Sequence, residues 1–391
     1  MSILKNIHVI EFAQGVAGPL AAVRLSDLGA QVIKWETGSG DWLRAVPPFV
    51  NGTAIGATFF ELNRGKKSQS LGDTPLSSKD QLLEQLKTAD VFITDRHADE
   101  LKAMGLEGLD GDTYAPNPRL VRVFISPWGS QGPWSKRLGS ELTAQAMAGY
   151  TRYLGSRTEP ACRLGADVAS TGTGIFAVQA VLAALLAIKR GLSQGQCIQV
   201  SLLNSLIALK SIHLAAQSDP DSYAGPRVGG ANYPPERGWK TKDGPIFFAF
   251  GGSVGASGRP GWVKFAEEAG FTSLLEDARF DPIGRTTTGY GSKVQEVRGD
   301  YEREFARYTA EELVTLIRKY SGNAASYQRL DQALRHPQTT ALEVIQTVTG
   351  PGTQDLEIRA FPARFSRSKL SYRGHCPALG EHALKTDPKT A

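Results

Sequence analysis

One carboxylate, that of Asp167, stands among small residues in the segment 162–174, immediately before a long apolar run. Carboxylates can act as nucleophiles in enzymes that pass through covalent intermediates. Aspartate is also a common helix N-cap, because its side chain accepts a hydrogen bond from a backbone N–H. Ser170, Thr171 and Thr173 lie closer to the apolar run and could cap the helix instead. Asp167 would then face a ligand, with the N–H groups of the helix end available to stabilise negative charge.

A second candidate is the segment AQGVAGP at positions 13–19, between a strand-like run and a helical pattern. Small residues there would let a ligand approach backbone N–H groups at the positive end of the helix, which suits a phosphate. The segment lacks the GxGxxG spacing of dinucleotide sites, and a tight turn explains it at least as well. Arg64, Lys66 and Lys67 surround a glycine and could clamp phosphates or form an exposed basic turn.

The sequence lacks the motifs of several other reaction classes. Its six histidines and three cysteines form no HExxH or CxxC pattern, so no metal site is predicted. The absence of a GxSxG elbow argues against an α/β-hydrolase. The net charge of +5 is spread along the chain, which suits a polyanionic small molecule and argues against nucleic acid as a partner.

The composition indicates a soluble globular protein, since 41% of the 391 residues are hydrophobic and 21% are charged. Cys162, Cys197 and Cys376 are widely spaced, which predicts reduced thiols and a cytoplasmic location. The N-terminal residues show no signal-peptide pattern. The longest apolar run, around 178–188, is expected to be too short to span a bilayer, so no membrane partner is predicted.

The elements that would position these residues alternate between strand and helix patterns. A strand at 8–13, a helix at 17–30 and a strand at 31–36 form a βαβ unit, which predicts a parallel sheet. Later segments continue the pattern, at 80–94, 119–129, 141–150, 165–191 and 195–217. The fold class predicted for the N-terminal half is therefore α/β, with an open, Rossmann-like large domain.

Changes in composition divide the chain into a large α/β domain at 1–215, a linker at 216–235 and a smaller α+β domain at 236–325. Residues 326–391 form a further linker and a C-terminal segment. Within the smaller domain we expect a hairpin turning at Lys242-Asp243-Gly244 and helices at 262–269 and 298–320. The tail that begins near residue 336 has the pattern of a helix or a strand.

The order and spacing of eight segments resemble the family III CoA-transferases, the CaiB/BaiF group. That family contains formyl-CoA transferase, carnitine CoA-transferase and α-methylacyl-CoA racemase. The resemblance rests on residues 11–36, 62–68, 86–93, 117–133, 141–150, 165–174, 195–205 and 379–382. It implies a C-terminal segment that packs back on the large domain and an interlocked homodimer. It also implies coenzyme A or an acyl-CoA as substrate, with no permanently bound cofactor.

The resemblance implies that Asp167, in the segment GADVASTGTG, is the catalytic carboxylate. It would attack an acyl-CoA thioester to give an aspartyl-acyl anhydride and release CoA thiolate. The thiolate would return to form an aspartyl-CoA thioester. A free carboxylic acid would then attack this thioester and leave as the new CoA ester. One difficult exchange is thereby split into easier steps at a single carboxylate.

The resemblance also implies the residues that contact CoA, namely Gly15, Val16, Ala17, Lys66, Asp95, Arg96, Lys102, Met104 and Arg137. Gly229 and Gly230 fall where formyl-CoA transferase has a mobile glycine loop, although a plain linker explains them equally. Trp42, Phe49 and Trp128 could line an acyl pocket or pack in the core.

The sequence departs from the family pattern in several places, one of which is Thr37, where some members carry arginine. TDRHAD at 94–99 replaces the common ENFRPG segment, and Ser140 stands where the racemase branch has its histidine. Racemisation needs an acid and a base on opposite faces of the α-carbon, so the missing histidine favours transfer. An acyl-CoA racemase or epimerase of the same fold, and a CoA-binding protein without turnover, are the alternatives.

Overall fold

The structure is a computed structural model that describes residues 2–71, 79–111, 114, 116–151, 160–210, 238–250, 259–277, 294–350 and 355–382. The chain divides into two compact units. Unit 1 comprises residues 1–152, 162–211 and 337–391, and unit 2 comprises residues 153–161 and 212–336. The domain boundaries that we placed at 215, 235 and 325 stay predictions. The glycine pair predicted as a mobile loop lies outside the described residues.

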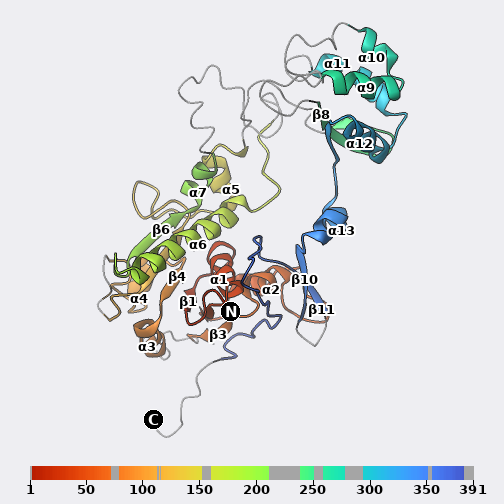
Figure 1. The fold of residues 1–391 in the computed structure, drawn as a ribbon. Coiled ribbons are helices and arrows are strands. Elements are labelled where there is room, and N and C mark those ends of the chain that lie inside the picture. The colour runs from red at the N-terminus through yellow and green to blue at the C-terminus, as the bar shows by residue number, and fades with distance from the viewer. Residues whose placement is uncertain are drawn as a thin grey trace. The chain divides into compact units, whose positions relative to one another are not determined.

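Unit 1 is built on a six-stranded parallel sheet with the strand order β3-β2-β1-β4-β5-β6 (Figure 1). The predicted α/β class is confirmed. Its central strand β1 pairs with β2 on one side and β4 on the other, so Ile10 lies opposite both Ile33 and Phe92. The strands are β1 (His8–Phe12), β2 (Gln31–Glu36), β3 (Lys67–Ser70), β4 (Val91–Thr94), β5 (Val121–Ser126) and β6 (Cys197–Ser201).

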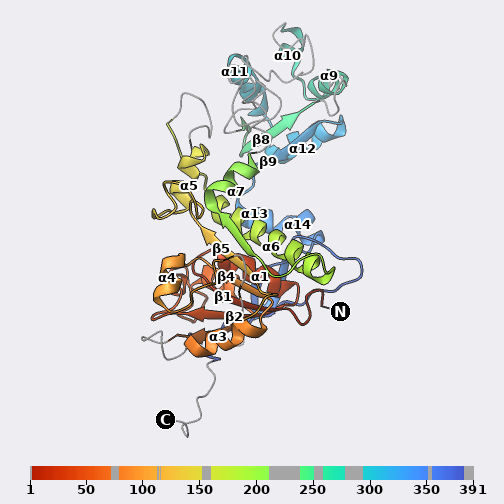
Figure 2. The ribbon, with the colours of Figure 1, turned by 90° about the vertical axis from the view of Figure 1, so that its left-hand side faces the viewer.

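Helices cover both faces of this sheet, because alternate strand residues point to opposite sides (Figures 1 and 2). Val9 and Val91 pack with helices α1 (Ala17–Asp27) and α6 (Val168–Lys189) on one face. Ile10 and Phe92 pack with α3 (Lys79–Thr88) and α4 (Ala98–Ala103) on the other face. Unit 1 also contains η1 (Trp42–Ala45), α2 (Ala57–Asn63), α5 (Glu141–Met147) and α7 (Leu202–Leu209).

Helix α6 is 22 residues long, which by length and composition is enough to cross a membrane. Our expectation that its apolar run is too short was wrong about length. In the structure α6 lies on the sheet, and nine of its residues are buried. Other apolar side chains on it stay exposed, including Ile175 and Leu186. A core helix of a soluble protein passes the same test of length and composition, so α6 is weak evidence for a membrane span.

The C-terminal segment packs against the start of unit 1, as the family resemblance implied. It contains both of the alternatives predicted for the tail, a helix α14 (Pro337–Ala341) followed by strands β10 (Ile345–Thr349) and β11 (Asp355–Arg359). Val348 and Ile358 share a core cluster with side chains of α1 and α2. Backbone hydrogen bonds join Gly65 N to His375 O and His382 N to Ser68 O.

Unit 2 is a small α+β structure with its own aromatic core. Its sheet has the order β7-β8-β9, and the antiparallel β7-β8 pair is the predicted hairpin. The predicted helix at 298–320 is two helices, because Thr309 and Glu312 form a capping box that starts a new one. The elements are β7 (Trp239–Lys240), β8 (Pro245–Ala249), α9 (Arg259–Glu268), α10 (Thr272–Glu276), α11 (Val294–Phe305), α12 (Ala310–Lys319), β9 (Asn323–Ser326) and α13 (Leu330–Arg335).

Candidate active site

Asp167 occupies the N-cap position of α6, but its side chain does not cap the helix. Its carbonyl oxygen accepts the first helical hydrogen bond, from Thr171 N at 2.9 Å. Its carboxylate makes no capping hydrogen bond, and the residue is exposed. The local pattern that suggested a cap therefore predicted the backbone position correctly and the role of the side chain incorrectly.

Glu141, the first residue of α5, caps α6 in its place. Its Oε1 atom accepts a hydrogen bond from Ala169 N at 2.8 Å. Its Oε2 atom accepts from both Ser170 N and Ser170 Oγ, each at 2.7 Å. We had expected Ser170, Thr171 or Thr173 to be the cap, and this was wrong. Ser170 donates to Glu141, and the Thr173 hydroxyl donates to Ala169 O within the helix.

Gln145, one turn further along α5, fixes the segment that leads into α6. Its amide nitrogen donates to Glu141 Oε1 at 2.8 Å and to Ala166 O at 3.1 Å. Its amide oxygen accepts from Leu164 N at 3.1 Å. Gln145 is only 2% exposed, so these bonds are shielded from water. Gln145 thus holds the chain before Asp167, and Glu141 holds the chain after it.

The loop after β1 lies at the point where the strand order reverses. In open parallel sheets, ligands bind in the crevice outside the carboxyl ends of the two strands at such a switch point. Here those strands are β1 and β4, and their loops carry Gln14, Gly15 and Asp95. Gln14 N donates to Asp95 Oδ2 at 2.9 Å, and this bond joins the two loops.

Gly15 takes a left-handed conformation at φ +70° that favours glycine. Its N–H donates to Asp41 Oδ1 at 3.1 Å. A Cβ atom at Gly15 would lie 3.3 Å from the indole ring of Trp42, which is 57% exposed. The N–H groups of Gln14 and Gly15 are thus used by protein carboxylates, and a CoA phosphate cannot take them without displacing these bonds.

Helix α6 approaches the first turn of α1 closely at Gly174. A Cβ atom at Gly174 would lie 2.8 Å from the carbonyl oxygen of Ala17, so only glycine allows this approach. Asp167 precedes Gly174 by seven residues, which is about 10 Å along a helix. The helix that begins after Asp167 therefore packs against the helix that begins at the predicted CoA loop Gly15, Val16 and Ala17.

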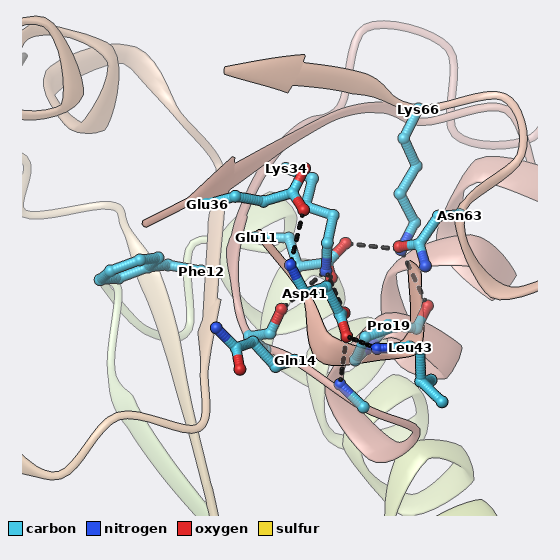
Figure 3. A network of polar contacts seen from close by, with 12 residues as sticks. Glu11, Phe12, Gln14, Pro19, Lys34, Glu36, Asp41, Leu43, Asn63 and Lys66 are labelled. Atoms are coloured by element: carbon cyan, nitrogen blue, oxygen red, sulfur yellow. Dashed lines mark hydrogen bonds and ion pairs between the residues drawn. The ribbon is translucent and has the colours of Figure 1, made fainter. Parts of the chain in front are cut away.

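A buried network of charged side chains lies beneath this loop (Figure 3). Glu11 is fully buried, and its two carboxylate oxygens accept from Lys34 Nζ at 2.8 Å and Lys66 Nζ at 2.6 Å. Lys34 also lies 3.0 Å from Asp41 Oδ2 and donates to Ala13 O at 2.7 Å. The network therefore connects the end of β1 to the carboxylate that holds Gly15.

The two lysines of this network respond differently to burial. For Lys34, burial alone would lower the pKa, but Glu11 and Asp41 outweigh it and raise the pKa above its ordinary value. For Lys66, burial is the larger effect and lowers the pKa to about 8, although Glu11 opposes it. Lys66 also donates to Pro19 O and Asn63 Oδ1. It is 2% exposed, so the structure shows a buried network residue where we predicted a CoA contact.

The remaining predicted CoA contacts lie along the carboxyl edge of β4 and β5. Arg96 packs over the ring of Phe12, and Lys102 is exposed on α4. Arg137 is exposed and stacks over Trp134, in a loop that Lys136 ties to Asp99 of α4 at 2.9 Å. Arg96 and Arg137 thus supply positive charge from two loops, and Lys102 supplies it from α4.

Asp95 and Met104 are placed less favourably for a phosphate. Burial raises the pKa of the Asp95 carboxyl to about 6, although 30% of its side chain remains exposed. Met104 packs, partly buried, against the core cluster of α3 and α4. Its side chain therefore contributes to packing. Trp42 and Phe49, at 57% and 45% exposed, are available at the surface.

One group in the described part of the chain brings potential metal ligands together, His375, Glu381 and His382, whose ligand atoms lie within 4.8 Å of one another. His375 Nε2 lies 2.8 Å from Glu381 Oε1, and His382 Nδ1 accepts from Ser68 N at 3.3 Å. In neutral His382 the proton must then be on Nε2, which leaves no lone pair for an ion there. We interpret the group as a hydrogen-bonded attachment of the C-terminal segment to β3.

Comparison with known proteins identifies the class to which this fold and site belong. The family model for CoA-transferase family III matches residues 4–383, so the chain belongs to that family. The predicted family, enzyme class and transferase activity are thereby confirmed.

Two curated relatives illustrate the family. A probable fatty acyl-CoA transferase, Rv3272, of Mycobacterium tuberculosis is 29% identical, covering 97% of this chain and 96% of its own. The succinate–glutarate CoA-transferase of Agrobacterium fabrum is also 29% identical, covering 97% of this chain and 93% of its own. A solved structure of a CaiB/BaiF family protein from Brucella suis has a TM-score of 0.79 at 25% identity, covering 97% of both chains.

Proposed function

We propose that this protein moves CoA from an acyl-CoA thioester to a free carboxylic acid, with Asp167 as the nucleophile. The observation that carries the proposal is the state of Asp167. It is an exposed carboxylate at a helix N-terminus whose N–H groups another residue caps. A carboxylate that is not engaged in capping keeps its lone pairs available for attack on a carbonyl carbon.

The reaction proceeds through three covalent states of Asp167, an anhydride with the donor acid, a thioester with CoA and an anhydride with the acceptor acid. Its carboxylate attacks the thioester carbonyl, the C–S bond breaks, and an aspartyl-acyl anhydride forms with release of CoA thiolate. The thiolate attacks the aspartyl carbonyl, which releases the acyl group as a carboxylate and leaves an aspartyl-CoA thioester. The acceptor carboxylate then attacks this thioester, which releases CoA thiolate and forms a mixed anhydride with Asp167. The thiolate attacks the acceptor's carbonyl carbon, which gives the new CoA ester and regenerates the Asp167 carboxylate.

We propose that CoA enters at the switch point between β1 and β4. Gly15, Val16 and Ala17 form the wall nearest Asp167, and Arg96, Lys102 and Arg137 attract the CoA phosphates. The positive side chains support this placement, since phosphate recognition depends on such charges. Because Asp41 and Asp95 occupy N–H groups of the α1 loop, side chains rather than that helix end hold the phosphates in this proposal.

We further propose a homodimer in the cytoplasm. Helix α6 is apolar on all sides, and Ile175 and Leu186 are 44% and 47% exposed in a single chain. A helix that is apolar all round is normally covered, which supports a second copy against this face. Cys162 and Cys376 are free thiols, and Cys162 is exposed, which supports a reducing location.

The test is the variant Asp167→Ala, assayed with succinyl-CoA and a set of carboxylic acids by mass spectrometry. Glutarate belongs in the set because human and Agrobacterium relatives are named for that acid. We expect transfer to fall by about a thousandfold or more, as for the loss of other nucleophiles. The matched control is Asp110→Ala, at an exposed aspartate of unit 1.

Hydroxylamine added during turnover should modify Asp167, and peptide mass spectrometry locates the modification. Near wild-type transfer by Asp167→Ala would overturn the mechanism. Exchange of the α-proton with deuterated water, without any need for an acceptor acid, would instead indicate the racemase alternative.

A further inference from the structure

We propose that Glu141 is a positioning residue, whose carboxylate occupies the N-terminus of α6 and thereby keeps Asp167 free to react. This inference rests on the proposed role of Asp167. It concerns a residue on another helix, 26 positions earlier in the sequence, for which the sequence pattern gave no sign of this function.

An N-cap side chain normally accepts from the N–H groups of the second or third residue of its helix. With Asp167 as N-cap, these belong to the second and third helical residues, Ala169 and Ser170. Glu141 accepts from both of them, at 2.8 and 2.7 Å, and from the Ser170 hydroxyl at 2.7 Å. Glu141 therefore fills the same positions that the Asp167 carboxylate would otherwise take.

Asp167 itself has a strong tendency to cap the helix that follows it. Aspartate is among the residue types most favoured at an N-cap, so without a competitor its carboxylate would turn back onto these N–H groups. Two hydrogen bonds to the positive end of a helix would then engage its lone pairs. The nucleophile would have to break those bonds before it could attack the thioester carbonyl.

Glu141 is itself held in place by Gln145. Gln145 donates to Glu141 Oε1 at 2.8 Å and is 2% exposed. Its remaining bonds to Ala166 O and Leu164 N fix the backbone immediately before Asp167. The carboxylate of Glu141 is thus fixed relative to both α5 and α6, as a positioning group requires.

The experiment compares Glu141→Ala and Glu141→Gln with wild type. We expect Glu141→Ala to lower kcat and the rate of hydroxylamine trapping at Asp167 by about tenfold, which is the cost of releasing a capping side chain. KM for the CoA ester should change by less than about threefold. Glu141→Gln should fall between, because its amide oxygen can still accept one of the two N–H bonds.

The matched control is Glu312→Ala in unit 2. Glu312 also caps a helix, accepting from Thr309 N and Thr309 Oγ1 at 2.8 Å each, so the control removes a carboxylate cap of the same kind. It should leave kcat and trapping rate unchanged. Trapping in Glu141→Ala at the rate of this control would overturn the inference.

A crystal structure of Glu141→Gln gives a readout that does not depend on activity. We expect the Asp167 carboxylate to accept a hydrogen bond from Ala169 N or Ser170 N. An Asp167 side chain that remains exposed and uncapped would overturn the inference. The two proposals can be refuted separately. Near wild-type transfer by Asp167→Ala would refute the nucleophilic role of Asp167, whereas control-like behaviour of the Glu141 variants would refute only the positioning role of Glu141.

Discussion

Replacing Glu11 with glutamine removes the negative charge that two buried ammonium groups share. Both oxygens of Glu11 accept a charge-assisted hydrogen bond, from Lys34 at 2.8 Å and from Lys66 at 2.6 Å, and all three side chains are 0% exposed. Such bonds contribute roughly 1.5 to 3 kcal/mol each, so losing two would cost about 3 to 6 kcal/mol. Removing one partner of a buried pair costs about 3 to 5 kcal/mol.

The lower end of this range is expected, because Lys66 can avoid part of the cost. Its pKa is already lowered to about 8 by burial, and losing Glu11 lowers that pKa further. In Glu11→Gln at pH 7, Lys66 therefore gives up its proton instead of remaining an unpaired charge. We expect the free energy of unfolding to fall by about 3 kcal/mol at pH 7.

The effect should depend on pH in a defined direction. Above about pH 8, Lys66 in the wild type also becomes neutral, so Glu11 then stabilises only Lys34. The unfolded chain keeps the Lys66 proton up to its ordinary pKa of 10.5, so wild-type stability gains from this group as pH rises from about 8 to 10.5. In Glu11→Gln this gain begins at a lower pH, because Lys66 is already neutral there, so the gap between wild type and variant should narrow up to about pH 8 and stay constant above it.

The measurement is urea denaturation followed by far-UV circular dichroism at pH 7.0 and pH 9.5. Glu84→Gln is the control, because Glu84 is 69% exposed and pairs with Lys87 at the surface, where such pairs contribute less than about 1 kcal/mol. The double variant Glu11→Gln with Lys66→Met should recover part of the loss, since it removes the buried amine whose deprotonation costs free energy in Glu11→Gln. A loss for Glu11→Gln no larger than that of Glu84→Gln would refute the reasoning.

Two further predictions concern the parts that position the CoA loop. Asp41→Ala removes the acceptor for Gly15 N. We expect KM for the CoA ester to rise by about tenfold in steady-state kinetics, the equivalent of one hydrogen bond to a charged group. An unchanged KM would show that this loop does not contribute to CoA binding. Gly174→Ala places a methyl group 2.8 Å from Ala17 O and should cost about 1 to 3 kcal/mol of unfolding free energy and lower kcat. Gly299 is a helical glycine at which an added Cβ atom would have nothing within 4 Å. Denaturation of Gly299→Ala should therefore show no loss of unfolding free energy, and an equal loss in both variants would contradict the close approach of α6 to Ala17.

The sequence predicted the elements of unit 1 where hydrophobic periodicity was strong and missed those where it was weak. The βαβ start, α6 and the strand before α7 have clear patterns and were predicted. Strand β3 has the sequence KSQS and carries no apolar alternation, so only its pairing with β2 makes it a strand. The division of α11 from α12 was missed, although Thr309 and Glu312 show the T-x-x-E capping signal.

The site was predictable only where one residue carries the chemistry. Asp167 could be found from its own neighbours and from the family resemblance. Glu141 could not, because its role depends on a helix contact that local sequence does not encode. Lys66 shows what a local pattern leaves out, since the sequence places a lysine beside a glycine and the fold buries it against Glu11. Burial of a charge is a property of the tertiary structure and is not visible in a basic run.

The attachment of the C-terminal segment to unit 1 has a consequence for how the chain matures during synthesis. Arg44 donates to Pro377 O at 3.0 Å across 333 residues, and His382 bonds to the edge of the parallel sheet. Unit 2 is inserted between these partners, so it leaves the ribosome before unit 1 has its last segment. At about 5 to 20 residues per second, the exposed edge of β3 and the apolar side chains of α2 wait roughly 15 to 60 seconds for that segment. This interval is when the nascent chain most needs a chaperone.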